Sequence, residues 1–299
     1  MELVFDIYKI YLMQHLKIFI ELTRLNKPIG YMLLFWPCSW SLAYSFSYNQ
    51  NPNIFIFYLV LFFLGSVLMR SAGCIVNDIV DRNLDNQVER TKNRPIPSGK
   101  ISIKKSLLYS LILCLLAFLI LIQFNFLTIS LGMVSMIFAF SYPFMKRITY
   151  WPQLFLGLTF NWGIVMAWTA FDNSISSDII LLYISAIFWT LGYDTIYGAQ
   201  DMSDDEIIGL KSTSIKFKEN IKLFVSMSYI TTILIIMYLF WESIKFNFFS
   251  FIFLLFSISL IYQIMKFDKN NSNTCLKMFK LNNLSGLLLF MGILSINYS

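Results

Sequence analysis

Two short stretches of the chain place amide and acidic side chains at a helical spacing. Asn77, Asp81 and Asp85 stand at positions i, i+4 and i+8, and Asp201 and Asp205 repeat the four-residue step. On a helix this spacing aligns side chains along one face. The pattern therefore predicts two ladders of oxygen ligands, each continuing a helix.

Most acidic residues of the chain gather around these ladders. Residues 78–89 and 194–206 together hold nine of the 17 Asp and Glu residues. Asp194 precedes Asp201 by about two helical turns. Like charges at this spacing repel one another, and in a medium of low dielectric they require a cation. Oxygen ligands without His or Cys suit a hard cation, with Mg²⁺ as first choice and Mn²⁺ as second.

Basic residues follow both ladders. Arg82, Arg90, Lys92 and Arg94 come after the first, and Lys211 comes after the second. Arg offers planar, bidentate donors to phosphate oxygens, and Lys offers a point charge. Mg²⁺ in proteins commonly joins one or two carboxylates to substrate phosphates. Acids and bases together therefore predict a site for a phosphate or diphosphate.

The elements that must position these residues are membrane helices. Of the 299 residues, 57% are hydrophobic and 13% are charged, with a mean hydropathy of +0.65, whereas soluble domains carry roughly 25% charged residues. We expect one all-α membrane domain over residues 1–299. Apolar runs of about 20 residues predict nine transmembrane helices, at 28–47, 55–76, 104–122, 124–142, 152–170, 176–195, 221–240, 246–265 and 281–297.

The basic residues also predict the orientation in the membrane. The N-terminal segment and the loops after even-numbered spans contain 22 of the 23 Lys and Arg, and Lys245 is the exception. Such residues concentrate on the cytoplasmic side. The N-terminus and both ladders are thus expected in the cytoplasm and the C-terminus on the opposite side. Residues 1–20 are expected to form an amphipathic helix on the membrane surface. The net charge of +6 suits a protein beside anionic lipid and needs no nucleic acid.

Histidine and cysteine chemistry is largely excluded. His15 is the only histidine, so Ser-His-Asp catalysis and His-ligated haem are ruled out. The cysteines Cys38, Cys74, Cys114 and Cys275 are far apart, with no CxxC pair. A zinc site or a disulfide framework is therefore not expected.

Four blocks of sequence carry a resemblance to a known family. They are RLNKPIGYMLLFWP (24–37), LMRSAGCIVNDIVDRNLDNQVERTKNRPIPSGK (68–100), YPFMKRITYWPQLFLG (142–157) and YDTIYGAQDMSDDEIIGLKSTSI (193–215). With NDxxDxxxD in the second block and DxxxD in the fourth, the chain resembles the UbiA-type membrane prenyltransferases over residues 21–297. YPFMKR and RPIPSG resemble the branch that acts on 4-hydroxybenzoate rather than the menaquinone or haem branches.

The resemblance implies a helical bundle around a central cavity open sideways to lipid, in a bacterial inner membrane. It implies transfer of a polyprenyl group from polyprenyl diphosphate to the ring carbon ortho to the hydroxyl of 4-hydroxybenzoate, with release of diphosphate, in ubiquinone biosynthesis. It also implies two Mg²⁺ ions, for which Mn²⁺ could substitute. The implied ligands are Asn77, Asp81, Asp85, Asp201 and Asp205.

The resemblance and the charge pattern together suggest roles for further residues. Arg147 and Arg24 are candidates for holding the carboxylate of the aromatic acid, with Arg147 preferred. Asp194 and Tyr197 are candidates for orienting ligands or accepting the ring proton. The catalytic set is Asp81, Asp85, Asp201, Asp205 and Arg147. The substrate-binding set is Arg24, Arg70, Arg82, Arg90, Lys92, Arg94, Lys146, Asp194, Tyr197 and Lys211.

Neighbouring side chains receive weaker assignments. Asp78 and Asp204 break the ladder spacing, so we expect them to support the ligands from behind or to be solvated. Arg70 lies two turns before Asn77, where a buried Arg requires a partner, and is expected to face the site. Candidates for an apolar cavity wall are Met69, Phe138, Phe160, Trp162 and Trp168.

Other functions stay open at this stage. A UbiA-type enzyme with a different acceptor fits the same motifs. A cation-coupled transporter also uses carboxylates within the membrane, although such sites commonly lie near the midplane on broken helices. A membrane CDP-alcohol phosphotransferase is metal-dependent and rich in Asp, but its DGxxAR pattern is absent from this chain.

Overall fold

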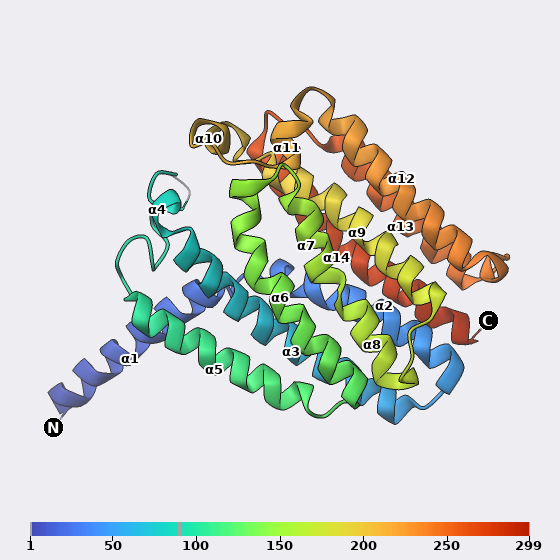
Figure 1. Cartoon of the computed structure of the whole chain (residues 1–299), viewed down its shortest axis with the longest axis horizontal. Coiled ribbons are helices and arrows are strands. Elements are labelled where there is room, and N and C mark those ends of the chain that lie inside the picture. Colours follow the sequence, from blue (N-terminus) through green and yellow to red (C-terminus); the bar gives the residue numbers. More distant parts are fainter. Residues whose placement is uncertain (1, 89–90, 299) are drawn as a thin grey trace.

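The computed structural model describes residues 2–88 and 91–298, and within these ranges it contains helices and turns but no strand. The helices, shown in Figure 1, are α1 Glu2–Thr23, α2 Ile29–Asn49, α3 Pro52–Val80, α4 Arg82–Asp85, α5 Ile103–Leu121, α6 Phe126–Ile148, α7 Pro152–Asn161, α8 Gly163–Asp172, α9 Ser177–Gly198, α10 Met202–Ile207, α11 Thr213–Lys216, α12 Ile221–Leu239, α13 Phe248–Lys266 and α14 Ser272–Ser295. Three short 3-10 turns, η1 Lys218–Asn220, η2 Trp241–Ser243 and η3 Ile296–Tyr298, complete the chain. The expected all-α fold is confirmed.

Polar side-chain caps mark where six of the long helices begin. In each case the cap side chain accepts a hydrogen bond from the backbone N–H three residues later, which satisfies one of the free donors of the first turn. The caps are Asn51, Ser102, Asn125, Ser176, Asn247 and Asn271. The chain therefore stops and restarts its helices at polar residues set between apolar runs.

Eight helical segments of the described chain are long and apolar enough to cross a membrane. α7 and α8 count as one of them, because the break at Trp162 is a local interruption of a single apolar stretch. The first predicted span, 28–47, is not one of these eight; it corresponds to α2, whose serines and tyrosines lower its hydropathy. α2 is nevertheless largely buried and packs against α3, α8 and α14. The count of nine spans therefore stays a prediction.

The observed helices extend beyond the predicted spans at several boundaries. α14 begins at Ser272, nine residues before the predicted start of the last span, because a helix can carry Lys277 and Lys280 in its first turns without ending. The second span was predicted to end at residue 76, but α3 continues to Val80. α3 therefore carries Asn77 within its last turn.

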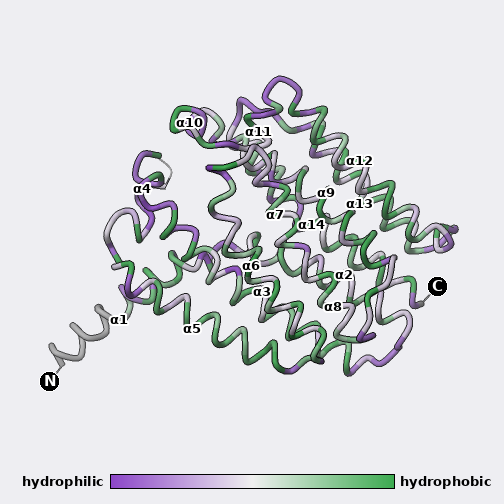
Figure 2. The backbone as a smooth tube through the Cα atoms, viewed as in Figure 1, coloured by the Kyte–Doolittle hydropathy of each residue, from purple (hydrophilic) through white to green (hydrophobic). Residues whose placement is uncertain are grey.

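The bundle has two sides joined by buried central helices. α3, α5 and α6 form one side, and α9, α12, α13 and α14 form the other, with α2, α7 and α8 between them (Figure 1). The short helices α4, α10 and α11 lie at one end of the bundle, away from the C-terminus. Figure 2 shows hydrophilic residues gathered at that end and hydrophobic residues along the long helices. The fold thus brings both acidic windows to the same end.

Candidate active site

The first ladder crosses from α3 into α4. α3 ends at Val80, and Asp81 adopts φ −91° and ψ 2° between the two helices. The N–H of Asp81 donates to the carbonyl of Asn77 over 2.9 Å, and the N–H of Asp85 donates to the carbonyl of Asp81 over 2.8 Å. The expectation of an unbroken helix here is wrong, but the four-residue hydrogen-bonding step survives the break.

The second ladder repeats this geometry. α9 ends at Gly198, and Asp201 adopts φ −111° and ψ 8° at the start of α10. The N–H of Asp205 donates to the carbonyl of Asp201 over 2.9 Å. In both windows, therefore, one Asp of the motif lies at a break between a long membrane helix and a short one.

Both ladders line a single cavity of about 920 Å³. Its wall combines residues of α3, α4, α6, α9 and α10 with the turn after α1. The predicted site residues that line it are Asn77, Asp81, Asp85, Asp201, Asp205, Arg24, Arg70, Arg94, Lys146, Asp194, Tyr197 and Lys211. The fold thus brings together residues separated by up to 187 positions, from Arg24 to Lys211.

Three predicted bases are not among the described residues of the cavity wall. Arg82 and Lys92 are exposed on the surface. Arg147 lies behind Asp81, where its guanidinium donates to the carbonyl of Val80 over 2.7 Å and to the Asp81 carboxylate over 3.3 Å. The fourth, Arg90, lies outside the described residues. The basic run after the first ladder therefore reaches the cavity through Arg94.

Asp81 is a buried carboxylate held by bases of α6. Its side chain is 1% exposed, and Lys146 Nζ donates to Asp81 Oδ2 over 2.5 Å. Arg147 adds the longer contact described above. A buried carboxylate needs such partners, because removing it from water costs several kcal/mol. The two bases supply the partners that this buried carboxylate needs.

Arg94 links Asp85 to Asp78. Its guanidinium donates to Asp85 Oδ2 over 2.8 Å and to Asp78 Oδ1 over 3.1 Å. The hydroxyl of Thr91 donates to the Asp85 carbonyl over 2.9 Å, which ties the loop that carries Arg94 to the ladder. Asp78 is 1% exposed, so it is not solvated, whereas Asp204 is exposed. The first window is thus a closed network of charges.

Arg24 completes this network from the turn after α1. It has a positive φ of 56°, a conformation that L-residues rarely adopt, and its guanidinium pairs with Asp78. Burial acts to lower the pKa of the Arg24 guanidinium, but nearby negative charge, including that of Asp78, outweighs it and raises the pKa above its ordinary value. The turn therefore delivers a permanent positive charge to the cavity.

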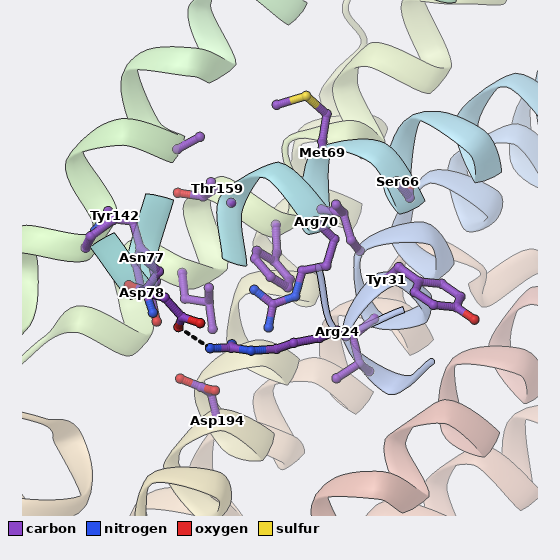
Figure 3. A pocket seen from close by; sticks show the side chains of 18 of the residues that line it. Arg24, Tyr31, Ser66, Met69, Arg70, Asn77, Asp78, Tyr142, Thr159 and Asp194 are labelled. Carbon is purple, nitrogen blue, oxygen red and sulfur yellow. Dashed lines mark hydrogen bonds and ion pairs between the residues drawn. The ribbon is translucent and has the colours of Figure 1, made fainter. Parts of the chain in front are cut away.

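Arg70 is the base that lies deepest along α3. Its Nε is buried and has no hydrogen-bond partner among the described residues, and its guanidinium lies 5.3 Å from the ring centroid of Phe160. A Cβ at Gly30 would come within 2.8 Å of this Nε, so glycine makes room for the guanidinium. Figure 3 shows Arg70 near Arg24 and Asp194. A buried donor without a partner indicates a place for a ligand.

The apolar wall confirms some predicted lining residues and not others. Met69, Phe160 and Trp162 line the cavity. Phe138 and Trp168 are not among its described lining residues, and the Phe138 ring packs 5.2 Å from that of Trp162. The cavity continues between α5 and α6, where it is lined by Leu115, Phe118, Leu121, Met133 and Met136. It therefore has a charged end and an apolar arm.

Several polar lining residues were missed by the sequence analysis, among them Gln153 and Tyr142. Gln153 is buried in α7, and its Oε1 accepts a hydrogen bond from the N–H of Thr213 over 2.9 Å. Tyr142 lines the cavity from α6. Both lie within the sequence block 142–157. A polar glutamine at the start of an apolar span could have indicated that Gln153 has a role in the site.

The ladders suit a divalent cation that is shared with a substrate. Among the described residues, no group of three or more His, Cys, Asp or Glu side chains is close enough to hold a metal alone. Mg²⁺ commonly takes only one or two carboxylates and completes its shell with water and substrate phosphates. Carboxylate and amide oxygens facing each other across a cavity fit that mode of binding.

The chain is similar to known proteins over nearly its whole length. The sequence profile of the UbiA prenyltransferase family matches residues 34–284. A 4-hydroxybenzoate octaprenyltransferase of Psychromonas ingrahamii is 40% identical over 276 residues, which cover 92% of this chain and 94% of that protein. The apo structure of a UbiA homologue from Aeropyrum pernix has a TM-score of 0.73 at 20% identity, covering 89% of this chain and 97% of the other. A UbiA homologue from Archaeoglobus fulgidus bound to GPP and Mg²⁺ has a TM-score of 0.68 at 16% identity, covering 94% and 100%. The chain belongs to the UbiA prenyltransferase family.

Proposed function

We propose that this chain transfers a polyprenyl group from polyprenyl diphosphate to the ring carbon ortho to the hydroxyl of 4-hydroxybenzoate, with Mg²⁺ as cofactor, in ubiquinone biosynthesis. Family membership and the name of the Psychromonas relative support this acceptor. The Archaeoglobus structure, with its prenyl diphosphate and Mg²⁺, supports the donor and the metal. The product would be the prenylated acid, and the leaving group would be diphosphate.

The observation that carries the proposal is the two-part cavity. Its charged end holds both Asp ladders together with Arg24, Arg94 and Lys146, and its apolar arm runs between α5 and α6. A prenyl diphosphate has the same two parts, a charged head and a long apolar chain. An enclosed apolar site also keeps water away from an allylic cation.

The charged end would bind the diphosphate through metal and bases together. Asn77, Asp81, Asp85, Asp201 and Asp205 would hold Mg²⁺, in our proposal two ions with Mn²⁺ as a substitute. When bound, Mg²⁺ neutralises the charge that develops on the leaving diphosphate. Arg94 and Lys146 lie against acids of the first ladder, and they are placed to donate to phosphate oxygens once the metal takes a share of those carboxylates.

The aromatic acid would lie beside Arg70. Its carboxylate would accept from the Arg70 guanidinium, which has an unused buried donor. This replaces the earlier preference for Arg147, because Arg147 is committed to Val80 and Asp81 behind the cavity wall. Asp194 lines the same space and is our candidate to accept the ring proton on a carboxylate oxygen, with Tyr197 beside it as the alternative.

The protein is an integral membrane protein, and we propose its place and orientation. The bacterial relative and the basic residues favour an inner membrane, with the N-terminus and the ladders on the cytoplasmic side. The C-terminus lies at the end of the bundle opposite α4 and α10, as that orientation requires (Figure 1). α1 is then placed to lie along the cytoplasmic membrane surface.

The direct test uses purified protein in lipid vesicles with polyprenyl diphosphate. We expect 4-hydroxybenzoate to be prenylated with one diphosphate released per product, activity to disappear on chelation, and Mg²⁺ to restore it. Prenylation of a naphthoate acceptor alone would assign the chain to another acceptor. Movement of substrate across the vesicle without diphosphate release would indicate a transporter.

A further inference from the structure

Two glycines of α3 face the cavity with open space in front of them. Gly65 and Gly73 stand eight residues apart, and both line the cavity. A Cβ built on either one meets no heavy atom of its described surroundings within 4 Å. Both lie inside a membrane helix, where glycine is less favourable than alanine.

The usual structural reasons for glycine do not apply at these two positions. Close helix packing explains other helical glycines: a Cβ at Gly192 would lie 2.2 Å from the Tyr229 ring, and one at Gly286 would lie 2.4 Å from the Trp36 ring. A positive φ explains Gly99 in a turn, where it is 74°. Gly65 and Gly73 have neither feature, so what they provide is the empty volume itself.

Gly73 lies between Arg70, the proposed partner of the acceptor carboxylate, and Asn77, the first residue of the first ladder. It is one turn after Arg70 and one turn before Asn77, and these two residues are about 10 Å apart along the helix axis. All three line the cavity. A flat aromatic ring whose carboxylate meets Arg70 and whose reacting edge points toward the first ladder would lie over the bare backbone at Gly73.

Gly65 lies further along α3, away from the ladders. It is about 12 Å from Gly73 along the axis. Ser110 of the neighbouring helix α5 donates to the carbonyl of Ala72 over 3.5 Å. Because α5 runs antiparallel to α3, Gly65 is level with Ala117 and Phe118, which line the apolar arm. The open space at Gly65 therefore belongs to the path of the apolar chain.

We infer that Gly73 and Gly65 are specificity-determining residues with separate targets. The missing side chain at Gly73 makes the space for the aromatic acceptor, and the one at Gly65 lets a long prenyl chain pass along the arm. This inference rests on the proposed function. It adds which of the two substrates each glycine of α3 makes room for.

The test compares Gly73→Val with Gly65→Val, each with its Ala variant, in lipid vesicles. For Gly73→Val we expect the KM for 4-hydroxybenzoate to rise by about tenfold or more, with the KM for the prenyl diphosphate nearly unchanged. For Gly65→Val we expect kcat/KM to fall by about tenfold for a long polyprenyl diphosphate but not for geranyl diphosphate. The Ala variants are expected to show the same pattern more weakly. Gly292→Ala is the control, because a Cβ there would make an ordinary 3.4 Å contact with Ile252 outside the cavity.

Equal changes in the two KM values for Gly73→Val would overturn the inference. An equal fall in kcat/KM for geranyl diphosphate and for the long polyprenyl diphosphate in Gly65→Val would overturn it as well, since a general effect on α3 would explain either result. An acceptor effect in Gly65→Val together with a chain-length effect in Gly73→Val would also contradict it. The wild-type protein distinguishes a failure of this inference from a failure of the proposed function. If it releases diphosphate but never prenylates 4-hydroxybenzoate, the proposed acceptor is wrong, and the Gly65 pattern can still be measured on the aromatic acceptor that it does use.

Discussion

The two acidic windows have the same backbone geometry but different surroundings. In the first, Asp78 and Asp81 are each 1% exposed, and bases from three other segments of the chain hold the acids. In the second, Asp201 and Asp205 are half-buried, and the neighbouring Glu206 forms an exposed ion pair with Lys218. One window is enclosed by the protein, and the other is more open to solvent.

The difference suggests how one site can bind both metal and phosphate. The first window holds its acids and bases together before any substrate arrives, so the charges are already in place and little ordering is needed. The second window is carried by a short helix that ends before Gly209, which has a φ of 75°. We expect the second window to adjust around the diphosphate and the first to stay in place.

The largest expected contrast is between Asp81→Ala and Asp201→Ala. Both should lower kcat by at least about 100-fold. Removing a residue that only orients a metal ligand already costs about 10- to 100-fold in activity, and removing the ligand itself should cost more. Asp81→Ala should lower the thermal unfolding temperature more than Asp201→Ala does, because Asp81 is 1% exposed and pairs with Lys146 and Arg147, whereas Asp201 is half-buried. Diphosphate release and thermal unfolding measure the two effects. Equal loss of stability in both variants would erase the contrast between the windows.

The next effect concerns the two candidate arginines for the acceptor. Arg70→Gln should raise the KM for 4-hydroxybenzoate by about 10- to 100-fold, the value of a charged hydrogen bond. Arg147→Gln should change this KM much less, because Arg147 contacts Val80 and Asp81 but is not itself among the described residues of the cavity wall. Steady-state kinetics at saturating prenyl diphosphate separates them. The reverse order would restore Arg147 as the carboxylate partner.

A smaller effect is expected at the basic run after the first ladder. Arg94→Ala should raise the KM for the prenyl diphosphate by about tenfold, and it should destabilise the fold by about 1–3 kcal/mol because Asp78 and Asp85 lose a shared donor. Lys92→Ala is the matched control, since Lys92 is exposed away from the described cavity wall. Similar kinetics for the two variants would mean that Arg94 does not contact phosphate.

The smallest effect is expected at the ion pair of the open window. Glu206→Ala removes the partner of Lys218, and both side chains are more than 40% exposed. Exposed pairs of this kind add little to stability. Thermal unfolding and kcat should both match the wild-type values. A clear loss of either would show that the second window is more ordered than its exposure indicates.

The sequence predicted the ladders, the helical class and most span positions, because these depend on local spacing and apolar runs. It missed the breaks at Asp81 and Asp201, since the four-residue hydrogen-bonding step continues past each of them although their φ and ψ angles leave the helical range. The expected continuation of the helix of the second span into the first ladder is confirmed as far as Val80, since α3 carries Asn77.

The roles of the bases were harder to predict for a related reason. Which base faces the cavity depends on tertiary packing, and Arg147 and Lys146 are adjacent in sequence but lie differently toward Asp81. The same is true of Arg24, whose approach to Asp78 depends on a positive φ in a turn. The sequence shows that bases lie near the motif, but it does not show which of them face the cavity.

The most direct test of a single shared site is a double-variant comparison of the two windows. We measure kcat/KM for polyprenyl diphosphate in Asp85→Asn, Asp205→Asn and the double variant, at saturating 4-hydroxybenzoate. Residues that act as one unit are strongly non-additive, so we predict that the double variant loses much less activity than the product of the two single losses. A loss equal to that product would contradict one shared metal–diphosphate site.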